Sequence, residues 1–106
     1  MRVLLDECVP KRLRLELTEH SVLTAAEAGY GGLSNGELLL RCASDFDRFL
    51  TVDRNLQFQQ NLKSLPVAVL VIHAQNNRFD TLRPAMPAVR SALAKIKRGE
   101  LAHVRV

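Results

Sequence analysis

The sequence has 106 residues, of which 47% are hydrophobic and 25% are charged. This length and balance are typical of one globular domain spanning residues 1–106, and they exclude collagen-like, low-complexity and strongly disordered chains. The longest apolar run, Val67–Ile72, is far shorter than the ~20 residues of a membrane helix. Because Asp6 and Glu7 interrupt the N-terminal residues, we expect neither a secretion signal nor membrane insertion, and we expect a cytoplasmic protein.

Charge is distributed unevenly along the chain. The 15 Lys and Arg residues exceed the 11 Asp and Glu residues, which gives a net charge of +4. Residues 1–61 hold seven bases and nine acids, whereas residues 62–106 hold eight bases and two acids. Acids concentrated early in a basic chain suit a protein that collects cations at one point and attracts a polyanion at another. Alternatively, Lys95, Lys97 and Arg98 simply solvate the end of a helix, where positive charge is favourable.

The first half of the chain alternates between apolar runs and helical patterns. We expect, in order, a strand at Val3–Leu5, a helix from Pro10, a strand at Ser21–Thr24, a glycine-rich connection at residues 29–32 and a helix from Ser34. Continuous apolar runs are typical of strands buried on both faces. Leu13 and Leu17 share a helical face, and Arg12 with Glu16 forms a plausible surface pair on that helix.

The second half continues the alternation. We expect a strand at Phe49–Val52, a short helix or loop at Leu56–Leu62, a strand at Val67–Ile72, a helix at about Thr81–Arg98 and a half-exposed edge strand at Leu101–Val106. The long helix contains Pro84 and Pro87, so its beginning must be irregular, and Gly99 ends it.

This order of elements predicts an α/β fold. Strands that alternate with helices require right-handed crossovers, which indicates a three-layer α/β/α domain with a mainly parallel sheet of about five strands. In such sheets, ligands bind outside the carboxyl ends of the strands, near the point where the strand order reverses. That edge is where a functional site is expected.

Acidic residues from three separate parts of the sequence are predicted to meet at this edge. Asp6 directly follows the first strand, Asp53 directly follows the third, and Glu37 opens the helix after the second. Clustered carboxylates repel one another unless a cation neutralises them. Mg²⁺ or Mn²⁺ prefers carboxylate oxygens and keeps water positions that phosphate oxygens can occupy, so the pattern points to phosphodiester hydrolysis.

Each of these acids also has a purely structural interpretation. Ser34 and Glu37 are spaced as a capping box at the start of a helix. Asp6 is suited to capping the first helix, and Asp53 to starting a turn with the two residues after it. These interpretations do not explain why both strand ends place an acid immediately after an apolar run, and we therefore favour a shared site.

Other kinds of site have weaker support in the sequence. Cys8 and Cys42 lack the spacing of zinc ligands and are too few for a disulfide framework, so we expect both to be reduced. The sequence has no Gly-x-x-x-x-Gly-Lys loop and no Gly-x-Ser-x-Gly elbow, so nucleotide motors and serine hydrolases are unsupported. His73 ends the fourth predicted strand, where a histidine is more often a partly exposed polar residue than a catalyst.

Three short motifs resemble those of the PIN-like superfamily, specifically its small bacterial toxin branch. They are Leu4-Leu5-Asp6-Glu7, Asn35-Gly36-Glu37-Leu38-Leu39 and Leu50-Thr51-Val52-Asp53-Arg54-Asn55, and the resemblance covers nearly the whole chain. It implies a metal-dependent endoribonuclease and the toxin of a toxin-antitoxin pair. It also implies that Asp6, Glu37 and Asp53 are catalytic and bind Mg²⁺ or Mn²⁺, with Glu37 orienting or deprotonating the attacking water.

The same resemblance suggests supporting residues. They are Glu7, Asn35, Arg54, Asn55 and Asn77. Asn77 lies in a Gln-Asn-Asn segment where the family places a fourth acid, and an amide contributes oxygen without charge. Arg54, with Lys11 and Arg12, is a candidate for holding the phosphates that flank the cleaved bond. RNA and a cognate antitoxin are the implied partners, and dimerisation is common in the family.

Two other functions remain open. One is a PIN-like binding module that no longer turns over substrate because its acid set is incomplete. The other is a phosphoacceptor domain similar to response-regulator receivers, in which Asp53 accepts phosphate while Asp6 and Glu7 hold Mg²⁺. His73 and Ala74 stand where receivers place Ser or Thr, and no Lys follows the last strand, which weighs against the receiver.

Overall fold

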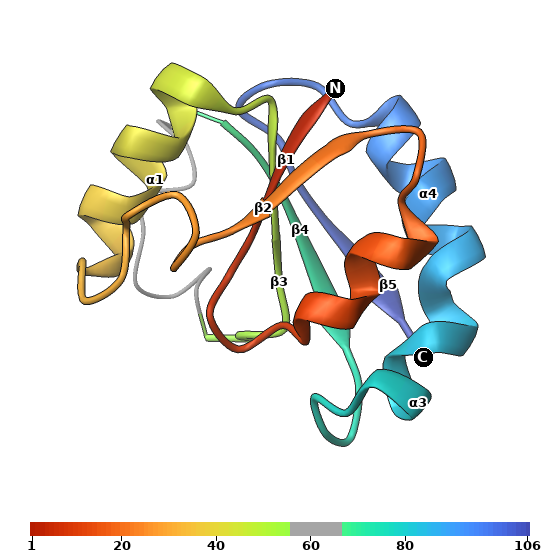
Figure 1. Ribbon diagram of the computed structural model, residues 1–106. Helices are drawn as coiled ribbons and strands as arrows, with labels where there is room; N and C mark the ends of the chain where they lie inside the picture. Colours follow the sequence, from red (N-terminus) through yellow and green to blue (C-terminus); the bar gives the residue numbers. More distant parts are fainter. Residues whose placement is uncertain (56–66) are drawn as a thin grey trace.

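Five parallel strands form the centre of the molecule. The computed structural model describes residues 1–55 and 67–106, and its sheet has the order β2-β1-β3-β4-β5 with every pair parallel (Figure 1). The strands are β1 (Arg2–Leu5), β2 (Ser21–Thr24), β3 (Arg48–Thr51), β4 (Ala68–His73) and β5 (Leu101–Arg105). The predicted α/β class, the parallel sheet and the five strands are confirmed. None of these strands begins or ends more than one residue from its predicted position.

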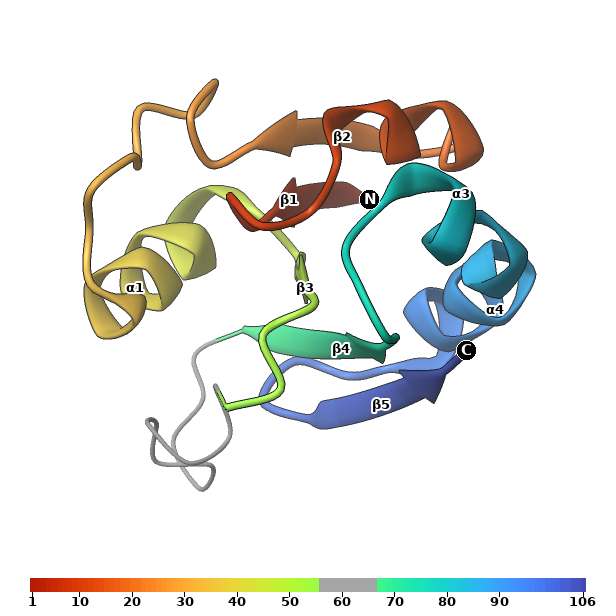
Figure 2. The same ribbon diagram turned by 90° about the horizontal axis from the view of Figure 1, so that it is seen from below.

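Helical segments cover both faces of this sheet. They are η1 (Lys11–Glu16), α1 (Asn35–Asp45), α3 (Phe79–Leu82), η3 (Arg83–Ala85) and α4 (Met86–Lys95), where η marks a 3₁₀ helix. Figure 2 shows α1 on one side of the strands and η1, α3 and α4 on the other. None of these segments, within the described part of the chain, has the length and apolar character needed to cross a membrane. The predicted helix or loop at Leu56–Leu62 lies outside the described residues.

Two apolar cores, one on each face, explain why the strand sequences are continuously hydrophobic. Leu4 and Phe49 belong to the core beneath α1, while Leu5 and Leu50 belong to the core beneath η1 and α4. Successive strand side chains point to opposite faces, so a strand covered on both sides needs apolar residues at every position. Each buried Leu or Phe contributes about 1.5–3 kcal/mol relative to exposure, so these runs are a main source of stability.

The first predicted helix is a 3₁₀ helix rather than an α-helix. The amides of Leu13 and Leu17 donate to carbonyl oxygens three residues earlier, at 3.0 Å each. With three residues per turn, residues four apart no longer face each other. The expected pair between Arg12 and Glu16 is therefore wrong: Arg12 stacks over the Phe79 ring at 4.2 Å, and Glu16 accepts from another arginine of the C-terminal half.

The last helical segment is divided at its prolines. Pro84 lies within η3 and Pro87 lies in the first turn of α4, where a missing amide hydrogen is tolerated. The predicted irregular beginning is confirmed, but α4 ends at Lys95, before the predicted end. Gly99 does not end the helix; it adopts a positive φ of 87° in the turn that leads into β5.

Both cysteines are free, as predicted. Cys42 lies in the core beneath α1, and burial raises its pKa to about 12. Its thiol therefore stays protonated at neutral pH and behaves as a small apolar side chain. Cys8 lies beside the carboxyl end of β1 and is described with the candidate site.

A single carboxylate connects η1 to the end of β2. Glu27 accepts from the backbone amide of Thr24 at 2.9 Å and from the Arg14 guanidinium, and the amide of Glu27 donates to the Thr24 hydroxyl at 3.1 Å. The Thr24 hydrogen bond first, and then Arg14, lower the pKa of Glu27 to about 2. The ionised carboxylate is thus favoured by the folded state.

The Glu27 contacts make stability depend on pH. A depressed pKa contributes stability above the unfolded value of 4.5, and this contribution is lost as the pH falls toward 2. We expect Glu27→Gln to lower the midpoint of thermal unfolding at pH 7, and the difference from the natural protein to shrink between pH 4.5 and pH 2. A difference that stays constant across that range would show that the charge of Glu27 is not responsible.

Candidate functional site at the carboxyl ends of β1 and β3

The strand order reverses between β1 and β3. β1 pairs with β2 on one side and with β3 on the other, so the crossovers that follow β1 and β3 run in opposite directions along the sheet. Ligands of open parallel sheets bind at such a point, outside the carboxyl ends of the strands. Asp6 follows β1 and Asp53 lies two residues after β3, so both predicted acids stand at this position.

Thr51, the last residue of β3, connects the two acids. Its side chain is fully buried, and its hydroxyl donates to one oxygen of the Asp6 carboxylate at 2.7 Å. The same hydroxyl accepts from the backbone amide of Asp53 at 3.0 Å. The Asp6 amide extends the β1–β3 ladder by donating to the Leu50 carbonyl at 2.9 Å. One hydroxyl thus fixes the position of Asp6 and the start of the turn that carries Asp53.

Asp6 is held on both of its oxygens. The second oxygen accepts from the Glu7 amide at 2.8 Å, and the Cys8 thiol donates to the oxygen that Thr51 also contacts, at 3.6 Å. Burial raises the pKa of Cys8, so the thiol keeps the proton that it donates. Asp6 is only 9% exposed, and a buried carboxylate needs such donors. The alternative that Asp6 caps the first helix is wrong, because η1 begins after Pro10 without a side-chain cap.

Asp53 combines a turn with partial exposure. Its carboxylate accepts from the Asn55 amide at 2.9 Å, the geometry of a turn initiated by an aspartate, which confirms the structural interpretation of this residue. Only one of its oxygens is used in that hydrogen bond. Asp53 therefore lies beside Thr51 with a carboxylate that is both oriented and accessible.

The third acid does not complete a three-carboxylate site. In residues 1–55 and 67–106, no three His, Cys, Asp or Glu side chains are grouped so as to hold a metal ion. α1 begins at the same edge of the sheet, as expected from the topology (Figure 1), but Glu37 is exposed there. Its amide donates to the Ser34 hydroxyl at 3.3 Å, so Ser34 is the N-cap of α1. Asn35 is the first residue of that helix.

Two predicted supporting residues contact the loops around Asp6. One oxygen of Glu7 accepts from the Gly32 amide at 3.4 Å, which directs this carboxylate to the loop before α1. The side-chain amide of Asn77 donates to the Cys8 carbonyl at 2.9 Å. Asn77 thus joins the loop after β4 to the loop after β1, next to the aspartate pair.

The three predicted phosphate-binding cations have different surroundings. Lys11 lies 4.0 Å from Glu27, and Arg12 stacks on Phe79, so both are engaged on the η1 side of the molecule. Arg54 is exposed and directly follows Asp53. Of the three, Arg54 is the cation closest along the chain to the aspartate pair.

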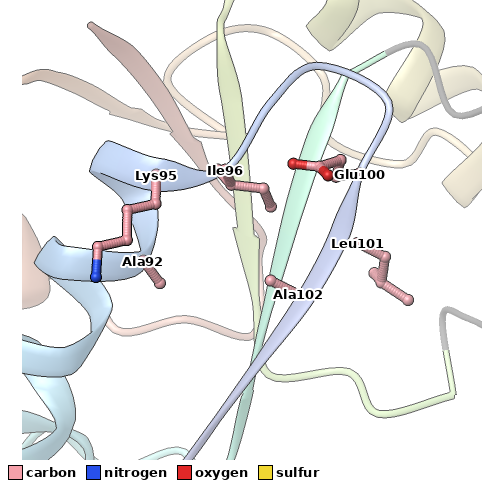
Figure 3. Close-up of a pocket in the computed structure, with 6 residues that line it drawn as sticks. All are labelled: Ala92, Lys95, Ile96, Glu100, Leu101 and Ala102. Carbon is pink, nitrogen blue, oxygen red and sulfur yellow. The ribbon is translucent and has the colours of Figure 1, made fainter.

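Two hollows lie at opposite ends of β5. One, of about 370 Å³, is at the carboxyl edge and is lined by Arg54, His73, Ala74, Gln75, Arg105 and Val106. The other, of about 340 Å³, lies between α4 and the amino end of β5 (Figure 3). Its lining is mostly apolar, with Lys95 and Glu100 as the charged side chains. The first hollow shares the edge of the aspartate pair, and the second does not.

Sequence reasoning missed Thr51 and Cys8 as parts of the site. Thr51 interrupts an otherwise apolar run with a hydroxyl, a signal that would have marked it as a hydrogen-bonding residue in a buried strand. Cys8 gives no such signal in the sequence, because its contact with Asp6 depends on how the loop after β1 turns back. No family model, curated protein or solved structure matches the chain.

The aspartate pair has the donor chemistry of a magnesium-type site with few protein ligands. Mg²⁺ retains several waters and is usually bound through one or two carboxylates rather than a complete protein cage. Asp53 offers an accessible carboxylate, and Asp6 is fixed beside it through Thr51. The two acids at this rim therefore have the oxygen chemistry that a hydrated divalent ion prefers, and Asp53 is the one whose carboxylate is partly exposed.

Replacing Thr51 tests its role at this site. Thr51→Val removes the hydroxyl at nearly constant volume, takes one of its donors from Asp6 and leaves the Asp53 amide without its acceptor, which costs about 1–3 kcal/mol. Thr51→Ser keeps the hydroxyl and serves as the control. We expect urea unfolding to show a clearly lower midpoint for Thr51→Val than for Thr51→Ser. Equal midpoints would mean that the hydroxyl contributes little.

Proposed function

We propose that the chain is a PIN-like domain of three-layer α/β/α form and a Mg²⁺- or Mn²⁺-dependent endoribonuclease. The observation that carries this proposal is the Thr51 hydroxyl, which holds the Asp6 carboxylate and the backbone amide of Asp53 at the switch point of the sheet. The resemblance to PIN-like motifs suggests RNA as the substrate and a role as the toxin of a toxin-antitoxin pair. It also suggests a cognate antitoxin as the partner and a homodimer as the assembly.

The proposed mechanism assigns separate tasks to the residues of this edge. Asp6 and Asp53 would hold the cation, and Thr51 keeps the Asp6 carboxylate and the Asp53 backbone in place before substrate arrives. The bound ion, when present, supplies positive charge that stabilises the phosphorane-like transition state and acidifies water. Glu37 orients or deprotonates the attacking water, and its exposure at the start of α1 leaves it free of packing constraints.

The receiver-like alternative is supported by one observation. The strand order β2-β1-β3-β4-β5 is that of flavodoxin-like sheets, which receivers share. The residue after β4 argues against it, because Ala74 cannot supply the hydroxyl that receivers place there. A silent PIN-like module is the other alternative, and it retains the aspartate pair without turnover.

Cleavage of single-stranded RNA tests the proposal. We expect the purified protein to cleave a labelled RNA in Mn²⁺ or Mg²⁺, and chelation of the metal to stop cleavage. Asp6→Asn and Asp53→Asn should each lower the rate by roughly 10²-fold or more, because a carboxylate ligand is lost, and Glu37→Gln should lower it by about 10²–10⁴-fold if it acts as the base.

Asp80→Asn is the matched control, because Asp80 is an exposed acid of α3 that is outside the proposed site. It should cleave at the rate of the natural protein. Circular dichroism should show that each variant is folded. Cleavage that survives both Asp6→Asn and Asp53→Asn contradicts the proposal. Transfer of a phosphoryl group from acetyl phosphate to Asp53, detected by mass spectrometry, would favour the receiver instead.

A further inference from the structure

The hollow at the carboxyl ends of β4 and β5 is basic. Two arginines line it: Arg54 follows the end of β3, and Arg105 is the last residue of β5. No Asp or Glu side chain is among its described lining residues, and neither arginine forms an ion pair within residues 1–55 and 67–106. Residues 56–66 contain no acid in the sequence that could neutralise them. Two arginines therefore line one hollow that no Asp or Glu side chain of the described residues lines.

One lining residue of this hollow, His73, is paired with His103, which is not among the lining residues. The Nε2 atom of His73 lies 2.7 Å from the Nδ1 atom of His103, so one ring donates to the other. The Val106 amide donates to the His73 carbonyl at 2.9 Å, which fastens the end of β5 to the end of β4. Burial first, and then Arg105, lower the pKa of His73, so this ring is neutral at pH 7. The end of β5 is thus hydrogen-bonded to the end of β4, and Arg105 lies at that strand end.

The hollow is placed next to the aspartate pair. Arg54 directly follows Asp53, and β4 and β5 are the next two strands of the sheet after β3. Neighbouring strands are about 4.8 Å apart, so the hollow begins within roughly 5–10 Å of the end of β3 along the same edge. The aspartates Asp6 and Asp53 and the arginine-lined hollow therefore lie side by side along the carboxyl edge of the sheet.

We propose that Arg54 and Arg105 bind a backbone phosphate of the RNA next to the phosphate at Asp6 and Asp53. A guanidinium group matches two phosphate oxygens in a bidentate hydrogen-bonded pair, which favours arginine over lysine at such a place. The basic hollow positions the RNA strand, while the neighbouring carboxylates and their ion act on the bond to be broken. This inference rests on the proposed nuclease function for the identity of the polyanion.

Binding without cleavage separates this inference from the nuclease proposal. Fluorescence anisotropy of a labelled 12-nucleotide single-stranded RNA, in EDTA, measures affinity at several salt concentrations. We expect Arg54→Gln and Arg105→Gln each to weaken binding by about 5–10-fold and to reduce the slope of log affinity against log salt by about 0.7, the value for one phosphate contact on a single strand. Arg105→Lys should bind with intermediate affinity.

Arg41→Gln is the control, because Arg41 is an exposed arginine of α1 that is not among the lining residues of the hollow. It should bind RNA as the natural protein does. Unchanged binding by Arg54→Gln and Arg105→Gln, or an equal loss for Arg41→Gln, would overturn the inference even if RNA is cleaved. Binding that depends on both arginines in a protein that never cleaves RNA would support the hollow and refute the nuclease. Thermal unfolding of each variant verifies that it is folded.

Discussion

The hydroxyl of Thr51 is the contact on which the candidate site depends. It lies fully buried at the end of β3, donates to the Asp6 carboxylate and accepts from the Asp53 amide. A carboxylate that is only 9% exposed needs hydrogen-bond donors to offset the cost of its burial. The Thr51 hydroxyl supplies one such donor and orients the Asp6 carboxylate. Two acids separated by 47 positions in the sequence are thereby joined through a single side chain.

The sequence was sufficient to predict the sheet because helical segments cover both of its faces. Continuous apolar runs have no alternation that could be read in two ways, and their positions correspond to β1, β3 and β4. The placement of Asp6 and Asp53 then followed from the rule that parallel strands end at one edge. The 3₁₀ form of η1 was not predictable, because Leu13 and Leu17 are compatible with an α-helix and only the backbone hydrogen bonds distinguish the two.

The side-chain contacts of the site depend on the register in which neighbouring strands pair, and this register cannot be read from the sequence. His73 is paired with Arg105 across β4 and β5, and this register brings His103 diagonally beside His73. Likewise, topology places the start of α1 at the correct edge but does not fix how far Glu37 lies from the aspartates. The expected group of three acids is not formed in the described residues for that reason.

The rim of the sheet combines two opposite charges at short range. Carboxylates at the ends of β1 and β3 attract a cation, and arginines beyond β3 and at the end of β5 attract an anion. In the proposed function, a phosphodiester with its metal ion would satisfy both requirements, because the ion would neutralise the acids and the guanidinium groups would neutralise the phosphates.

A titration with Mn²⁺ followed by NMR tests the central claim most directly, because the paramagnetic ion broadens the signals of nuclei near its binding site. We expect the backbone amides of residues 6–8 and 51–53 to broaden first, at Mn²⁺ well below one equivalent. We also expect Asp53→Asn to abolish this selective broadening. Broadening that begins instead around an exposed acid such as Asp80 or Glu100, or that spreads evenly over the protein, would contradict the account.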